Sequence, residues 1–211
     1  MNTLQFFSQH GSEILQGTLE HVGLVAATMA LAIAIGVPLG ILVARKPWLS
    51  KPIIGGANIA ETIPSLALLG FLLPAPWLGE RADRVAITAL TLYALLPIIR
   101  NTATGIAAVD PAVREAARGM GMTPRQILFQ VELPLSLSTV IAGIRVATVL
   151  TIGVATIAAA VGAGGLGEFI FRGLAMVNNR LILAGAIPAA ALALLADFIL
   201  SVLERRLRPA R

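Results

Sequence analysis

The chain has 211 residues, of which 57% are hydrophobic and 13% are charged, and its mean hydropathy is +0.86. A soluble domain carries roughly 25% charged residues, so this composition argues against a soluble protein and indicates several membrane spans. The lack of cysteine and the presence of only two histidines exclude disulfides, thiol catalysis and a Cys- or His-rich metal site. The net charge of +5 fits basic cytosolic loops beside a lipid bilayer better than nucleic-acid binding.

Residues 1–20 are weakly amphipathic and contain neither lysine nor arginine, which predicts an uncleaved helix lying in the membrane interface on the non-cytosolic side. Apolar runs long enough to cross a bilayer as helices follow at residues 22–44, 52–74, 85–108, 135–161 and 181–203. The sequence therefore predicts an all-α membrane protein with five transmembrane helices in a single domain, 1–211. Prolines inside these runs predict kinks, because neighbouring helices can satisfy the carbonyls that proline frees; they are Pro38, Pro64, Pro97 and Pro188.

Basic residues predict the orientation of these spans, because lysine and arginine collect in cytosolic loops. An outside N-terminus and a cytosolic C-terminus put the larger group in the cytosol: Arg45, Lys46, Lys51, Arg114, Arg118, Arg125, Arg205, Arg206, Arg208 and Arg211. The same arrangement leaves only four outside: Arg81, Arg84, Arg172 and Arg180.

The longest charged interval between spans, residues 110–134, is then cytosolic. Asp110 followed by Pro111 is a favourable helix start, and Gly119 and Gly121 are expected to end that helix. A second start at Thr123 predicts a helix to about Leu133, with Pro134 breaking the chain before the next span. These local signals fit two short cytosolic helices with a special role and an ordinary loop hairpin equally well.

The sequence Glu115-Ala116-Ala117, followed by Gly121, Val131, Leu133 and Pro134, resembles the EAA motif of permease subunits of binding-protein-dependent ABC importers. Val131 stands where that family has isoleucine. The resemblance implies the type I ABC importer permease fold, with the first helix of the 110–134 coupling loop docking into a groove on a separate ATPase subunit. The coupling residues that it implies are Glu115, Ala116, Ala117, Gly119, Gly121, Leu133 and Pro134.

The same resemblance implies the partners and the setting. They are an ABC ATPase subunit, a periplasmic or lipid-anchored substrate-binding protein and a second permease copy or paralogue, in the bacterial cytoplasmic membrane. The chain would not itself be an enzyme, and it contains no G-x-x-x-x-G-K-[ST] phosphate loop. The binding protein would deliver substrate on the outer side, at residues 77–84 and 162–179.

Residues 61–69 and 153–167 are similar to the osmoprotectant branch of the family, whose importers take up glycine betaine, choline, carnitine and related quaternary amines. Permeases of the methionine and amino-acid type share the five-span plan and remain an alternative. An autonomous channel or secondary transporter is the alternative from a different class. The 110–134 insert argues against it, since that insert needs a partner.

Residues 162–167 fit the pattern G-x-G-x-x-G, but a membrane span rather than a strand precedes them, so we expect a flexible external loop and no cofactor. No metal site is expected either. The chain also has no cluster of aromatic residues with which to cage a quaternary amine, which places selectivity in the separate binding protein.

Three charged residues, Glu61, Arg100 and Arg145, lie inside apolar runs, where charges are costly and usually face the bundle interior or a cavity. Each is roughly 12–15 Å from the cytosolic end of its span. We therefore expect Glu61 to pair with Arg145 or Arg100, either as a lock on the bundle or as a gate in the path. Asn101, Thr148 and Thr151 could line that path, although threonine hydroxyls in helices commonly bond back to their own backbone.

Overall fold

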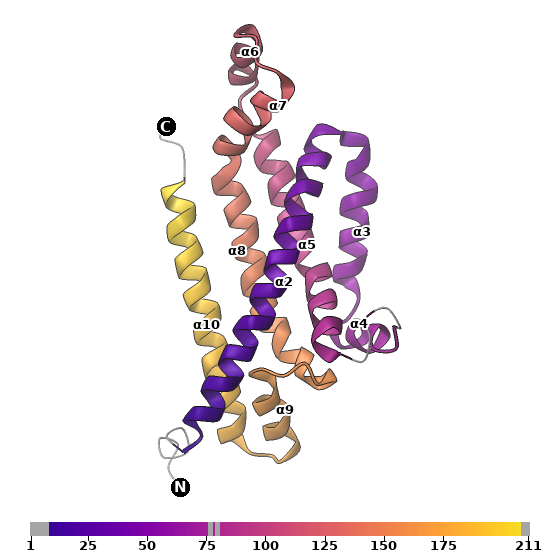
Figure 1. The fold of residues 1–211 in the computed structure, drawn as a ribbon, viewed down its shortest axis with the longest axis vertical. Coiled ribbons are helices and arrows are strands. Elements are labelled where there is room, and N and C mark those ends of the chain that lie inside the picture. The colour runs from indigo at the N-terminus through magenta and orange to yellow at the C-terminus, as the bar shows by residue number, and fades with distance from the viewer. Residues whose placement is uncertain (1–8, 76–77, 79–80, 208–211) are drawn as a thin grey trace.

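The computed structural model describes residues 9–75, 78 and 81–207, and the elements assigned there are all helical (Figure 1). They are α2 (Gly11–Arg45), η1 (Pro47–Leu49), α3 (Ser50–Thr62), α4 (Ser65–Leu72), α5 (Ala82–Ala107), α6 (Pro111–Gly119), α7 (Pro124–Ile127), η3 (Leu128–Glu132), α8 (Leu133–Ala158), η4 (Ala159–Val161), α9 (Gly167–Ala175) and α10 (Asn179–Arg206). The all-α prediction is confirmed.

Four helical runs among the described residues are long and apolar enough to cross a membrane: α2, α5, the continuous run Pro124–Val161, and α10. The pair α3 and α4 supplies a fifth crossing if it counts as one span, although a 98° bend divides it. The separate interfacial helix expected over residues 1–20 is wrong in its described part, because Gly11–Glu20 are the first turns of α2. Residues 1–8 of that prediction lie outside the described residues.

The long helices pack side by side, with α5 between α2 and α8, α3 also against α5, and α10 on the far side of α8 (Figure 1). Small residues allow the close approach. A Cβ added to Gly40 of α2 would lie 2.5 Å from Thr102 Cβ of α5, and one added to Gly143 of α8 would lie 2.5 Å from Asn101 Cβ. Glycine at these positions therefore sets the spacing of α5 against both neighbours.

Pro64 explains the bend between α3 and α4. A proline disfavours helical geometry at the residue before it, and Ile63 is extended, with φ −69° and ψ 128°. The Tyr93 hydroxyl of α5 donates to the freed Ile63 carbonyl. The predicted kink at Pro64 is thus a full break, whereas Pro38, Pro97 and Pro188 lie inside unbroken helices.

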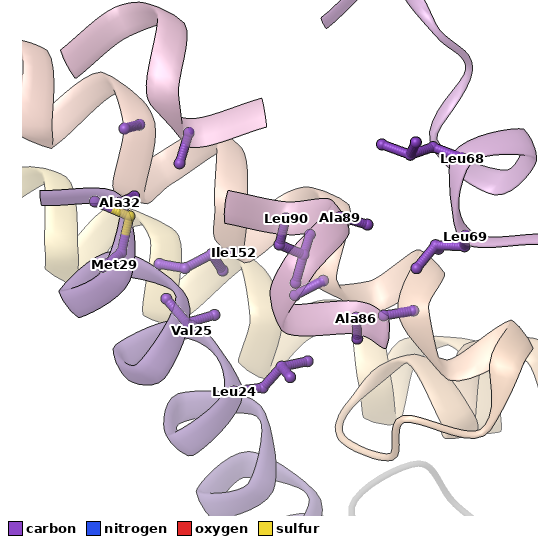
Figure 2. Close-up of a cluster of buried hydrophobic side chains, with 14 of the residues drawn as sticks. Leu24, Val25, Met29, Ala32, Leu68, Leu69, Ala86, Ala89, Leu90 and Ile152 are labelled. Atoms are coloured by element: carbon purple, nitrogen blue, oxygen red, sulfur yellow. The ribbon is translucent and has the colours of Figure 1, made fainter. Parts of the chain in front are cut away.

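The apolar core lies where α2, α4, α5 and α8 meet (Figure 2). Short α4 is held there by Leu68 and Leu69, which are 5% and 1% exposed. Figure 2 shows these two side chains beside those of the longer helices: Leu24, Val25, Met29, Ala32, Ala86, Ala89, Leu90 and Ile152. The core therefore fixes the α3–α4 bend against the bundle.

The glycine-rich segment 162–167 is a packed turn, so the expected flexible loop is wrong. Gly162, Gly164 and Gly165 have φ near +80°, and a Cβ added to Gly167 would lie 1.9 Å from the Thr156 carbonyl oxygen. The Gly165 amide donates to Glu20 at 3.2 Å, which ties the turn to α2. Glycine is therefore needed here so that the backbone of the turn can lie close to the neighbouring helices.

Candidate coupling site and membrane path

The predicted coupling loop contains two capped helices. The Asp110 carboxylate accepts from the Ala112 amide at 2.8 Å at the start of α6, and Gly121 provides the turn after it with φ +80°. Thr123 and Gln126 form a capping box at the start of α7. The two predicted helix starts and the glycine turn are confirmed. Figure 1 shows α6 and α7 at the end of the molecule opposite α9.

Pro134 does not break the chain, which corrects the prediction. Helical structure runs without interruption from Pro124 to Val161. A π-helical turn, η3, ends directly before α8, and the Leu133 amide donates to the Leu128 carbonyl five residues earlier. Pro134 has no amide hydrogen and cannot donate to the carbonyl four residues earlier. The widened π turn lies at this point, where the regular helical hydrogen bond is already missing. The coupling loop and the fourth span therefore share one helix.

Glu132, at the end of η3, is the centre of a buried ion cluster. Its side chain is 6% exposed, and its two carboxylate oxygens accept from Arg45 at 2.6 Å and from Arg114 at 2.9 Å. Arg45 ends α2 and also donates to the Pro124 carbonyl at 3.3 Å. Arg114 belongs to α6 and also donates to the Ile106 carbonyl of α5. The Glu132 carboxylate therefore joins α6 to α2 and to the helical run that contains α8, and Arg114 extends the cluster to α5.

The outer face of α6 is open. Val113, Ala116 and Met120 follow one another at spacings of three and four residues and are all exposed, with Met120 at 75%. Of the predicted coupling residues, Ala117 is buried against the bundle and Leu133 is half-buried. The others are exposed: Glu115, Ala116, Gly119, Gly121 and Pro134. An apolar stripe on a polar loop is the kind of surface that a protein partner covers.

The expected pairing of Glu61 is wrong. Arg145 of α8 lies 3.7 Å from Asp197 and 3.5 Å from Glu204, both on α10. Arg100 of α5 donates to Asn58 of α3 at 3.1 Å. Among the described residues no ion pair reaches Glu61. Similar depth in the membrane is not enough for two residues to pair, because they must also lie on helix faces that are turned toward each other. Arg145 lies on the face of α8 that packs against α10.

The polar residues predicted to line a path bond locally in most cases. Thr148 donates to the Ile144 carbonyl at 2.8 Å, and Asn101 donates to the Pro97 carbonyl at 2.8 Å. Thr151 is 2% exposed and faces the sulfur of Met29 at 3.7 Å. Only Thr151 belongs to a cavity that also contains Glu61, described below.

Sequence reasoning missed Glu132 and His21. Glu132 is one of three carboxylates, with Asp110 and Glu115, in a loop that also holds arginines, and its position in the sequence did not single it out. His21 is fully buried in α2, with Nε2 3.1 Å from the Ile152 carbonyl oxygen, and nothing in the local pattern marked it. In the predicted substrate-delivery segment 77–84, Arg81 and Asp83 form an exposed ion pair at 3.0 Å, while Trp77 lies outside the described residues.

Comparison with known proteins identifies this architecture. The family model described as "Binding-protein-dependent transport system inner membrane component" matches residues 36–209. The chain belongs to that family of ABC importer permeases. This permease is 46% identical to the carnitine transport permease protein OpuCB of Listeria monocytogenes, over 97% of its own length and 92% of the relative's. It is 43% identical to the osmoprotectant import permease protein OsmW of Salmonella typhimurium, covering 99% and 98% of the two chains.

Solved structures agree with this assignment. The permease superposes on a chain of the MetNI methionine ABC transporter in an inward-facing form with a TM-score of 0.82 and 25% identity, over 92% and 96% of the two chains. A chain of an amino acid ABC transporter gives a TM-score of 0.72 at 21% identity, covering 98% and 99%. The expected type I importer permease fold and the expected inner-membrane transport role are confirmed.

Proposed function

We propose that this permease moves quaternary-amine osmoprotectants such as glycine betaine, choline or carnitine into the cell. The observation that carries the substrate class is the set of relatives at 42–46% identity over nearly the whole chain, which are named as carnitine, osmoprotectant and choline permeases. The permease works as a dimer, with a second copy or a paralogue. A substrate-binding protein supplies the substrate on the outer side, and a separate ABC ATPase supplies the energy.

The coupling residues are proposed to act through α6. Its exposed stripe of Val113, Ala116 and Met120, flanked by Glu115, enters a groove on the ATPase. Gly119 and Gly121 end the helix and buried Ala117 packs it inward, while Leu133 and Pro134 begin α8, through which its movement would pass. The Glu132 cluster supports this role, since it fastens α6 to the ends of the spans that must move. Closure of the ATPases then turns the bundle from an inward-facing to an outward-facing state.

The charges at the ends of the bundle support the proposed orientation. The C-terminal end of α10 points toward the end that holds α6 (Figure 1). Arg45, Arg205 and Arg206 belong to the last turns of α2 and α10. Basic residues favour the cytosolic side, so the N-terminus is outside and the C-terminus is in the cytosol.

Uptake assays test the substrate and the need for partners. A bacterial strain that lacks its own osmoprotectant uptake should accumulate labelled choline, carnitine or glycine betaine when permease, ATPase and binding protein are produced together, and should not when the ATPase is omitted. Uptake of methionine but of no quaternary amine would overturn the substrate class. Uptake by the permease alone in proteoliposomes would favour a channel or secondary transporter.

Cysteine labelling tests the orientation. Because the sequence has no cysteine, one introduced at Lys46 or at Arg180 is the single thiol of the chain. Membrane-impermeant reagents applied from outside should label Arg180→Cys and not Lys46→Cys.

Co-purification tests the coupling surface. Met120→Asp should abolish co-purification of the ATPase, whereas Met120→Leu should preserve it. Undiminished co-purification with Met120→Asp would remove α6 from the interface.

A further inference from the structure

We propose that the cavity under the α3–α4 bend, which contains Glu61 and Tyr93, is a transient binding site for the quaternary ammonium group of the substrate during its passage. The substrate class rests on the proposed function. The site itself rests on three observations that do not depend on that function: a cavity of suitable size, a carboxylate without an ion pair and an aromatic residue that lines the same cavity.

The cavity exists because of the break at Pro64. It has a volume of about 320 Å³, which lies in the range of roughly 300–1,000 Å³ usual for small-ligand pockets. Its walls come from four helices and the bend itself. The polar part consists of Glu61, Thr62, Ser65, Tyr93 and Thr151. The remaining wall is apolar, with Leu150 and Val154 of α8 opposite α3.

The charge of Glu61 indicates that water or protein, not lipid, covers this face. Glu61 is exposed, and no described basic side chain pairs with it, since Arg100 bonds to Asn58 and Arg145 lies beside α10. An uncompensated carboxylate within a membrane span is costly and marks a water-filled cavity or an ion pathway. The cavity therefore fits a position on the translocation path.

The chemistry of the walls suits a quaternary ammonium group. Such a cation has no N–H to donate, so it is attracted by negative charge and by aromatic faces and tolerates apolar surroundings. Tyr93 is half-buried, and its hydroxyl is fixed by the Ile63 carbonyl, which holds the ring at the edge of the cavity. One carboxylate and one ring make a weak site, and weak binding lets a substrate leave again during transport.

A thiol-labelling experiment tests the site directly. Leu150→Cys places the only cysteine of the chain on the cavity wall. A thiol reagent that carries a trimethylammonium group should label it about tenfold faster when Glu61 is present than in a Glu61→Gln background, because a cleft of one sign concentrates counter-ions. A neutral reagent of similar size should label both equally. Millimolar choline should slow the cationic reagent in the complex that retains Glu61.

Uptake gives the second readout. Glu61→Gln should lower choline uptake at least tenfold while the ATPase activity stimulated by loaded binding protein is kept. Asp197→Asn removes a carboxylate from a span on the other side of the bundle and should leave choline uptake unchanged. Tyr93→Phe should retain more uptake than Tyr93→Leu. Equal labelling of Leu150→Cys by the trimethylammonium reagent with and without Glu61 would overturn the site. Lack of quaternary-amine uptake by the unaltered complex would overturn the proposed function instead, whatever the labelling rates.

Discussion

Two glutamates of this permease lie in opposite surroundings. Glu132 is 4% exposed, and each of its carboxylate oxygens accepts from a different arginine. Glu61 is exposed at the rim of a cavity, and none of the described basic residues pairs with it. A buried charge whose partners are all present can hold elements in a fixed arrangement. An open charge without a partner adds little to the fold and remains available to a ligand.

The largest expected effect comes from removing the paired glutamate. Glu132→Ala leaves two arginines facing each other without their anion, and breaking a buried ion pair from one side costs roughly 3–5 kcal/mol. The melting temperature in detergent, followed by circular dichroism, should fall by about 6–20 °C for a chain of this size. Glu115→Ala, at an exposed carboxylate of the same loop, should leave it nearly unchanged. Equal effects of the two changes would contradict the central role of the cluster.

The turn beside this cluster should be the next most sensitive. An added Cβ meets no described atom within 4 Å at either Gly121 or Gly119, and only Gly121 has a positive φ, of +80°. Gly121→Ala should therefore lower the unfolding free energy by about 1–2 kcal/mol through backbone strain alone. Gly119→Ala should be neutral or stabilising, since it lies at the end of α6. Thermal unfolding of the pair measures the difference, and a stable Gly121→Ala variant would show that the turn can change its conformation.

An intermediate case is Asp197, which is half-exposed and lies 3.7 Å from Arg145. Such a contact is an ion pair without a hydrogen bond, and exposed pairs contribute about 0.2–1 kcal/mol. Asp197→Asn should lower the unfolding free energy by no more than that. Arg145→Met should cost more, because Glu204 is also left without this partner. A larger loss in Asp197→Asn than in Arg145→Met would contradict the observed geometry.

The smallest effect on stability should come from Glu61→Gln. With no ion pair to lose among the described residues, the change should alter the unfolding free energy by less than about 0.5 kcal/mol. The same melting experiment as for Glu132→Ala makes the comparison direct. A loss of 2 kcal/mol or more would mean that Glu61 has a structural partner, and it would remove the contrast between the two glutamates.

Features fixed by neighbouring residues could be predicted from the sequence. The caps at Asp110 and Thr123 depend on residues two and three positions away, and the turn at Gly121 depends on the positive φ of that glycine; each was predicted correctly. The spans were found because bilayer crossing needs only length and apolarity. The family followed from the spacing of Glu115, Gly121 and Pro134.

Features fixed by distant residues could not be predicted. Depth in the membrane placed Glu61 level with Arg145, but the side of the helix on which each residue lies depends on packing. Arg145 faces α10 and pairs with Asp197 and Glu204 there. Pro134 was assigned a break because proline usually ends a helix, and the π turn before it removed the conflict. Glu132 was overlooked because its two arginines come from residues 18 and 87 positions away.

The unbroken helix from Pro124 to Val161 has a mechanical consequence. Its 38 residues make a rod of about 57 Å at 1.5 Å per residue, with Glu132 near one end. A tilt of only about 5° about one end of a rod of that length displaces the other end by roughly 5 Å. A small displacement at the end that holds α6 and α7 can therefore be delivered as a movement about one helical pitch in size at the opposite end, where the helix ends against the turn of Gly162–Gly167.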